Sequence, residues 1–195
     1  SNDTCKAADA KAWQTTYFPL IVGVSIKAGH LIYPHLFSGI IRAMPKIHLS
    51  TFIQAPRAKV WDVMLSDATY RDWTNAFNPG SYYKGNWEEG SKMLFLGPDP
   101  TGASKGEGGM VSRIRKNKLH EFVSIEHLGM VMNGVEDTTS DEVKKWAGAH
   151  ENYTFTDKDG GTELVVDMDI SESEKVMMEE MWKKALVRLK ELAES

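Results

Sequence analysis

Cysteine is nearly absent from this chain of 195 residues, and its scarcity excludes several kinds of site. Cys5 is the only cysteine, so the chain can form neither an intramolecular disulfide nor a thiolate metal cage. A free cysteine without a partner fits a reducing compartment. We therefore expect a cytoplasmic protein.

Metal-binding and phosphate-binding motifs are also missing. The histidines show no H-E-x-x-H or comparable spacing, and G-x-x-x-x-G-K-[ST] does not occur. GEGGM at 106–110 is an incomplete dinucleotide fingerprint, and it precedes a strand-like rather than a helical run. We expect no metal ion, no nucleotide and no other cofactor.

Positive charge is scarce outside the N-terminal part of the chain. The net charge is −4, with five basic and two acidic residues in 1–50, which leaves 18 basic and 25 acidic residues (−7) in the remainder. An acidic body of this kind binds polyanions poorly. Nucleic acid is therefore not expected as a partner.

No uninterrupted apolar run is long enough to predict a transmembrane helix with certainty. The most apolar segment, 17–41, is broken by Pro19, Lys27, His30 and Pro34. Residues 1–45 form an N-terminal extension whose role stays open. Residues 17–41 could pack on the domain or on a second copy of it, contact a membrane surface or a partner protein, or be an extension that is poorly ordered or derived from cloning.

Alternating apolar residues begin at Lys46 and predict the start of a domain over 46–195. Residues 46–55 read as a strand, and Pro56 opens a helix with an apolar stripe. Six further strands are expected in 81–85, 91–97, 109–116, 118–129, 151–157 and 162–171, with a short helical piece over 140–146.

The chain ends in its best-defined helix. Ser171 and Glu174 have the spacing of a capping box, and an apolar stripe then runs from Met177 to Leu192. A curved antiparallel sheet and a long amphipathic helix each have one apolar face to bury. We therefore predict an α+β domain in which about seven strands wrap around the last helix.

The order of these parts, with APRAKVWDVMLSDATYRDWT, GNWEEGSKM, LGMVMNGVED and WKKALVRLKELAE, resembles the Bet v 1-like START superfamily. More narrowly, residues 46–195 are similar to AHSA1-type SRPBCC proteins, which are related to the Hsp90-ATPase activator. The resemblance implies a helix-grip fold with a cavity between the sheet and the C-terminal helix. It leaves the chemistry open, because relatives bind lipids, hormones or polyketides and a few are cyclases.

Strand parity indicates which side chains face that cavity. Val123 and Ile125 share their side of a strand with His127, and Glu151 shares its side with Tyr153 and Phe155. His127 and Glu151 are thus a candidate polar pair on neighbouring strands. They could satisfy each other, anchor a ligand, or act as weak candidates for acid–base catalysis.

Large aromatic side chains gather between Tyr70 and Phe95, among glycines that allow tight loops. Methionines in the first half of the last helix could adapt to ligands of different shapes. The predicted ligand-binding residues are Trp73, Phe77, Trp87, Met93, Phe95, Met110, His127, Glu151, Tyr153, Phe155, Met168, Met178, Met181 and Trp182.

Three functions remain open at this point. The first is non-catalytic binding of a small hydrophobic or amphipathic ligand, lipid-like or aromatic. The second is a co-chaperone-like module that contacts a protein partner or forms a homodimer. The third is a cyclase or hydrolase that uses His127 and Glu151. A cavity above roughly 300 Å³ would favour the first.

Overall fold

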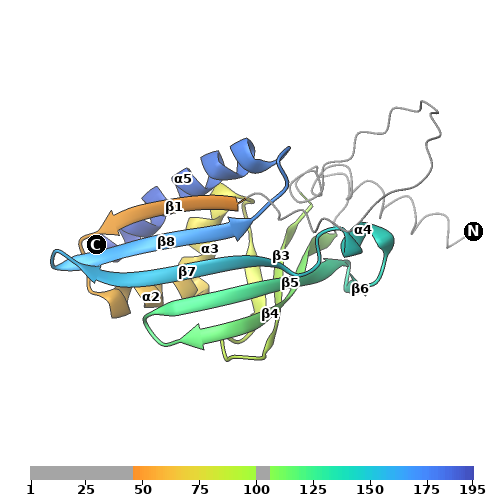
Figure 1. Ribbon diagram of the computed structural model, residues 1–195, viewed down its shortest axis with the longest axis horizontal. Coiled ribbons are helices and arrows are strands. Elements are labelled where there is room, and N and C mark those ends of the chain that lie inside the picture. Colours follow the sequence, from red (N-terminus) through yellow and green to blue (C-terminus); the bar gives the residue numbers. More distant parts are fainter. Residues whose placement is uncertain (1–45, 100–105) are drawn as a thin grey trace, which may run out of the picture.

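An antiparallel sheet and a long C-terminal helix form the domain in the computed structural model, which describes residues 46–99 and 106–195 (Figure 1). The strand order is β1-β8-β7-β5-β4-β3-β2, and the short β6 pairs with β5 outside this path. The strands are β1 (Lys46–Ile53), β2 (Tyr82–Gly85), β3 (Lys92–Pro98), β4 (Glu107–Lys118), β5 (Phe122–Met132), β6 (Val135–Asp137), β7 (Ala149–Lys158) and β8 (Gly161–Asp169).

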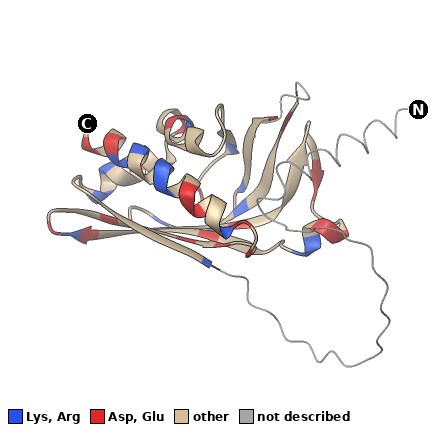
Figure 2. Ribbon diagram, turned by 90° about the horizontal axis from the view of Figure 1, so that it is seen from above, with Lys and Arg blue, Asp and Glu red and all other residues tan. Residues whose placement is uncertain are grey.

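Helices cover one face of this sheet. They are α2 (Arg57–Leu65), α3 (Asp67–Trp73), the 3₁₀ turn η2 (Thr74–Ala76) and α5 (Lys175–Glu194). The short α4 (Asp141–Lys144) lies at one end of the sheet instead, where its Val143 packs with Met130 of β5 (Figure 1). Figure 2 shows α5 lying over one face of the curved sheet, with basic and acidic residues both present along the helix. The predicted helix-grip architecture is confirmed, and β6 is an eighth strand that the sequence pattern did not reveal.

Two helices occupy the stretch between β1 and β2, where the sequence predicted one. Ser66 interrupts them with an extended backbone (φ −69°, ψ 138°), and its carbonyl then accepts the first hydrogen bond of α3, from Tyr70 N at 2.8 Å. Serine favours such a break because its hydroxyl can hydrogen-bond to nearby backbone groups in non-helical conformations. It is therefore less favourable inside a helix than at the start of one. The break turns Trp73 toward α5 rather than outward.

The predicted capping box at the last helix is wrong. The helix begins at Lys175, and Glu174 is the residue before it rather than a residue of its first turn. Ser171 and Glu174 instead close a turn, in which the Ser171 hydroxyl donates to the Glu174 carboxylate and Glu174 N donates to Ser171 O at 3.2 Å. The three-residue spacing of Ser171 and Glu174 therefore belongs to a turn that precedes the helix, and not to a cap on its first turn.

The space between the sheet and the helices differs at its two ends. Beneath α2 and the second half of α5 it is filled by fully buried side chains, among them Ile53, Val60, Leu164, Leu189 and Ala193. At the other end lie the first half of α5, α3 and the ends of β3 and β5. Within residues 46–99 and 106–195, this second end contains a cavity between the sheet and the helices.

In the described part of the chain, no helix combines the length and the apolar character that are needed to cross a bilayer. The predictions for residues 1–45, including a membrane-surface role for 17–41, lie outside the described residues.

Candidate functional site

A cavity of about 230 Å³ lies between the sheet, α3 and the first half of α5. Its walls come from β3, β4, β5, β7 and β8 on the sheet side. Partly exposed lining residues such as Met132 and Asp169 place one side of it near the surface. The structure brings together at this cavity the predicted residues Trp73, Phe77, Phe95, Met110, His127, Glu151, Tyr153, Met168, Met178 and Trp182.

Trp87 is predicted from the sequence to bind the ligand, but it does not line this cavity. It lies on a separate surface groove with Trp61, Leu65 and Asn117. Its indole N–H donates to Leu65 O at 3.0 Å, and its carbonyl accepts from Asn117 Nδ2 at 2.6 Å. The first bond holds the ring against the C-terminal end of α2, and the ring centre lies 6.0 Å from that of Phe95, which itself lines the cavity.

Met93 and Phe155 face inward as predicted but do not line the cavity. Each lies two residues along its strand from a residue that does, Phe95 and Tyr153, which displaces it by about 7 Å. The displacement is toward the filled end, where Met93 is fully buried and the Phe155 ring lies 5.1 Å from the ring of Trp61 on α2. Both are core residues.

Met181 also lies outside the cavity. It precedes Trp182 on α5, and one residue turns a helix by about 100°. Met178 and Trp182, four residues apart, therefore share the face toward the cavity, whereas Met181 flanks it and is only partly buried against the core.

A row of four polar side chains crosses β4, β5 and β7 on the inner face of the sheet. The Tyr153 hydroxyl donates to Glu151 Oε1, and His127 Nε2 lies 3.5 Å from Glu151 Oε2. Ser112 Oγ is 2.9 Å from His127 Nδ1. All four side chains are buried, so each depends on the others for its hydrogen bonds.

Burial raises the pKa of the Tyr153 phenol well above its ordinary value of 10.0, and the neighbouring Glu151 carboxylate raises it further. Burial also raises the pKa of the Tyr70 phenol, with a smaller contribution from Glu151. A phenolate in either place would be desolvated and close to a negative charge. Tyr153 is therefore a hydrogen-bond donor to Glu151 that keeps its proton.

The geometry of the row differs from that of a nucleophilic triad. Ser112 is fully buried and is not among the residues that line the cavity, so its hydroxyl cannot reach a molecule held there. It orients the imidazole of His127 instead, as a second partner commonly does for a functional histidine. His127, Glu151 and Tyr153 do line the cavity and form its polar wall.

Sequence reasoning missed Ser112, although a signal for it existed. Met110 is among the predicted ligand-binding residues, and Ser112, two positions further along the same strand, has the same parity. The pairing of Ser112 with His127 depends on a register shift between Val111 and Ser112, which no periodicity reveals. Three more residues that line the cavity were not predicted, because they lie in or just after α3, a helix that the sequence pattern did not reveal: Tyr70, Thr74 and Asn78.

Aromatic rings form the wall opposite the sheet. The rings of Trp73 and Trp182 stack at 5.7 Å, and Phe77 meets Trp182 edge-on at 5.0 Å. The indole N–H of Trp73 donates to Met64 O at 3.1 Å. The indole N–H of Trp182 is buried and finds no acceptor among the described residues.

Within residues 46–99 and 106–195, no three histidine, cysteine, aspartate or glutamate side chains are grouped as a metal site would require. The cavity residues therefore offer hydrogen bonds and apolar contacts rather than a ligand set for a metal ion.

Solved structures share this fold at low sequence identity. CalU16 from Micromonospora echinospora is 17% identical, with a TM-score of 0.52 over 76% of this chain and 75% of that one. Protein NE0264 from Nitrosomonas europaea is 14% identical, with a TM-score of 0.56 over 78% and 96%. The Aha1 dimer from Colwellia psychrerythraea is 16% identical, with a TM-score of 0.55 over 77% and 97%. These similarities concern the fold alone.

No curated protein matches the chain. A family model does, and it covers residues 54–194, which include every element from α2 to α5. By that match the chain belongs to the family described as Activator of Hsp90 ATPase homolog 1-like protein.

Proposed function

We propose that this protein binds a small hydrophobic or amphipathic ligand, lipid-like or aromatic, in the cavity and catalyses no reaction on it. The observation that carries the proposal is the cavity itself, an apolar space with one polar wall formed by His127, Glu151 and Tyr153. Ligand sites usually have this composition, with a few polar groups that set the orientation of the ligand.

The size of the cavity limits the ligand. The volume of about 230 Å³ is below the roughly 300 Å³ that was expected for a ligand-binding protein, so the composition of the cavity rather than its size supports the proposal. It is larger than the roughly 150 Å³ that suffices for benzene. A molecule with two fused rings or a short branched chain fits these limits, whereas a long acyl chain would have to extend into solvent.

The state of the polar wall supports binding over catalysis. Glu151 already accepts from Tyr153 and lies next to His127, and the raised pKa of Tyr153 makes its phenol a poor proton donor near neutral pH. A cyclase or hydrolase would need one of these groups free to exchange a proton with its substrate. This arrangement makes the enzyme alternative the weaker one.

The test uses two adjacent methionines on α5. Met178 lines the cavity and is buried, whereas Met177 is 46% exposed and does not line it. Met178→Trp should fill the cavity, and Met177→Trp is the matched control. Native mass spectrometry and solvent extraction of freshly purified protein should show a small molecule on the wild type and on Met177→Trp that is reduced at least severalfold on Met178→Trp.

Equal ligand content in the two variants would contradict the proposal, provided that both melt cooperatively. So would the absence of any bound molecule together with no uptake of naphthalene-sized probes.

A second candidate is a co-chaperone-like interaction module, which the family description favours. The Aha1 dimer of similar fold also makes a homodimer worth testing. Of the large exposed apolar residues of the described chain, three lie on α5, one on β6 and one in the turn between β4 and β5, namely Val176, Met177, Val187, Val135 and Leu119. Stimulation of an Hsp90 ATPase by the full chain would favour this candidate, and sedimentation over a range of concentrations would reveal a dimer.

A further inference from the structure

A surface groove of the domain lies outside the cavity and has a different composition. It is bounded by the C-terminal end of α2, by β2 and the loop that follows it, and by the end of β4. We call it the Trp87 groove, and its aromatic residues are Trp61, Tyr83 and Trp87. It encloses about 430 Å³, which is above the roughly 300 Å³ at which ligand pockets usually begin. The groove is therefore large enough to hold a small molecule.

Two of its rings have their polar groups bonded to α2. The Tyr83 hydroxyl donates to Leu65 O at 2.8 Å, and the Trp87 indole N–H donates to the same oxygen at 3.0 Å. The two rings meet edge to face, with their centres 5.4 Å apart. Since both donors are already used, the rings have only their carbon surface to offer a ligand. The face of an aromatic ring carries negative charge density, which attracts cations.

Two carboxylates at the groove have no ion-pair partner. Asp62 on α2 and Glu88 after β2 are exposed, and neither side chain forms an ion pair or a hydrogen bond within the part of the chain that the structure describes. The end of α2 at Leu65 adds the partial negative charge of a helix C-terminus. The groove thus combines aromatic rings with negative charge.

Basic side chains on α2 do not offset these carboxylates. None of the described residues that line the groove is lysine, arginine or histidine. Arg57 pairs with Asp157 at 3.2 Å. Lys59 donates to the carbonyl of Ser195 at 2.8 Å. Both cations of this helix are therefore engaged with other partners.

Basic residues of β4 and of the turn after it also lie outside the groove. Lys116 and Lys118 lie on the opposite face of the sheet from Asn117, which lines the groove, because successive residues of a strand alternate. His120 meets the edge of the Trp61 ring at 5.8 Å but does not line the groove. A cation in the groove would therefore meet two carboxylates without competition from a lysine or arginine there.

We propose that the Trp87 groove is a second binding site of this domain and that it takes a small organic cation, an alkylammonium with apolar substituents on its nitrogen. The carboxylates and the ring faces attract the charge, and the ring carbons contact the alkyl groups. A small molecule fits the groove better than a protein surface does, because Leu119 is the only large and highly exposed apolar residue of the described chain that lines it.

Choline and its uncharged isostere 3,3-dimethylbutan-1-ol test this proposal. NMR titration of the full chain follows the indole N–H resonances, and that of Trp87 is assigned with Trp87→Phe. At pH 7.5 an ordinary histidine is mostly uncharged, so the carboxylates and the rings dominate. The Trp87 resonance should shift with choline, and choline should bind at least about threefold more tightly than the alcohol.

Two double variants isolate the contribution of the carboxylates. Asp62→Asn with Glu88→Gln removes both charges and keeps the side-chain shapes, and it should weaken choline binding at least about threefold. Asp159→Asn with Glu172→Gln is the matched control, because it changes the net charge equally at exposed carboxylates that do not line the groove. The control should bind choline within about twofold of the wild type. Thermal melts check that both variants are folded.

Several results would overturn the proposed cation site. They are equal affinity for choline and the alcohol, equal losses in the two double variants, and an unchanged Trp87 resonance at the highest choline concentration. A shift of the Trp182 resonance in place of Trp87 would also overturn it, because Trp182 lines the cavity instead. The proposed function stands or falls separately, on the small molecule that the wild type and Met178→Trp carry.

Discussion

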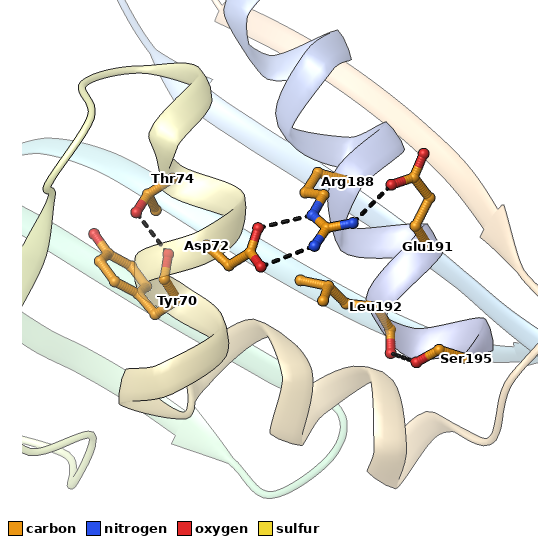
Figure 3. A network of polar contacts seen from close by, with 7 residues as sticks. All are labelled: Tyr70, Asp72, Thr74, Arg188, Glu191, Leu192 and Ser195. Carbon is orange, nitrogen blue, oxygen red and sulfur yellow. Dashed lines mark hydrogen bonds and ion pairs between the residues drawn. The ribbon is translucent and has the colours of Figure 1, made fainter.

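Asp72 on α3 accepts two hydrogen bonds from the guanidinium of Arg188 on α5, at 2.7 and 2.9 Å (Figure 3). Arg188 also donates to Glu191 on its own helix at 2.9 Å. The pair joins, on the outer side, the same two helices whose Trp73 and Trp182 stack at the cavity. The two helices that carry the aromatic wall are thus joined by stacked rings at the cavity and by an ion pair on their outer side.

We expect Asp72→Asn to lower the melting temperature by less than about 4 °C, because an exposed ion pair contributes at most about 1 kcal/mol and bidentate geometry places this pair at the upper end of that range. Thermal unfolding followed by circular dichroism measures this. Lys183→Gln, which breaks an exposed pair with Glu180 within α5, is the control for a pair that joins no second helix. If Asp72→Asn lowers the melting temperature no more than Lys183→Gln does, the Asp72–Arg188 pair does not stabilise the contact between α3 and α5.

The Asp72–Arg188 pair also predicts that the stability of the protein changes with pH in the acid range. The hydrogen bond from Arg188 lowers the pKa of Asp72 below its ordinary value of 3.8. A carboxyl group whose folded pKa is lowered stabilises the protein above its unfolded pKa, and this stabilisation is lost as the pH falls through the folded value. The stability difference between wild type and Asp72→Asn should therefore be constant near neutral pH and shrink below about pH 4.

Ser112→Ala should remove the hydroxyl that orients His127. Because the pair is buried, we expect the free energy of unfolding to fall by about 1–3 kcal/mol. Ser124→Ala is the matched control, since Ser124 Oγ lies 3.1 Å from His150 Nδ1 in a less buried pair. Chemical denaturation measures both variants, and long-range nitrogen–proton NMR should show a change in the His127 ring only in Ser112→Ala. An unchanged His127 spectrum would contradict the orienting role.

Alkaline conditions should destabilise the domain through its buried tyrosines. The pKa of Tyr70 and of Tyr153 is raised above 10.0 in the folded protein, so both remain protonated when the unfolded chain begins to lose those protons. Their contribution is complete below about pH 10 and is lost above it.

Tyr153→Phe should therefore make the fall of stability above about pH 10 shallower, by up to about 1.4 kcal/mol per pH unit. Denaturation curves at several alkaline pH values give the slope. Phenolate absorbance provides a second check, because the signal of Tyr153 should appear only together with unfolding. Reversible titration of all tyrosines in the folded state would contradict this prediction.

Gly109→Ala should disrupt the cavity end of the sheet. A Cβ atom at Gly109 would lie 1.8 Å from the backbone oxygen of Phe95 on β3, which cannot move without breaking the ladder. We expect a loss of at least about 2 kcal/mol in the free energy of unfolding. Gly134→Ala is the control, because its Cβ would meet no atom within 4 Å and only the backbone angle (φ +77°) is strained. A smaller loss at Gly109 than at Gly134 would show that β3 can shift.

The sequence alone determined the architecture and the inner face of the strands. Alternation with a period of two assigned His127, Glu151 and Tyr153 to one side of the sheet, and the 3.6-residue stripe assigned Met178 and Trp182 to one side of α5. These assignments depend only on local backbone geometry, which neighbouring residues fix. The family resemblance, confirmed by the match over 54–194, rests on the same order of elements.

Tertiary structure decided how far along each element the cavity extends. Periodicity cannot distinguish Phe95 from Met93, or Tyr153 from Phe155, because both members of each pair face inward. The difference arises because α2 packs above one end of the sheet and leaves no cavity there. Likewise, a register shift between β4 and β5 brings Ser112 to His127, and the break at Ser66 brings Trp73 onto Trp182. Such long-range placements follow from the packing of whole elements, which no local pattern in the chain encodes.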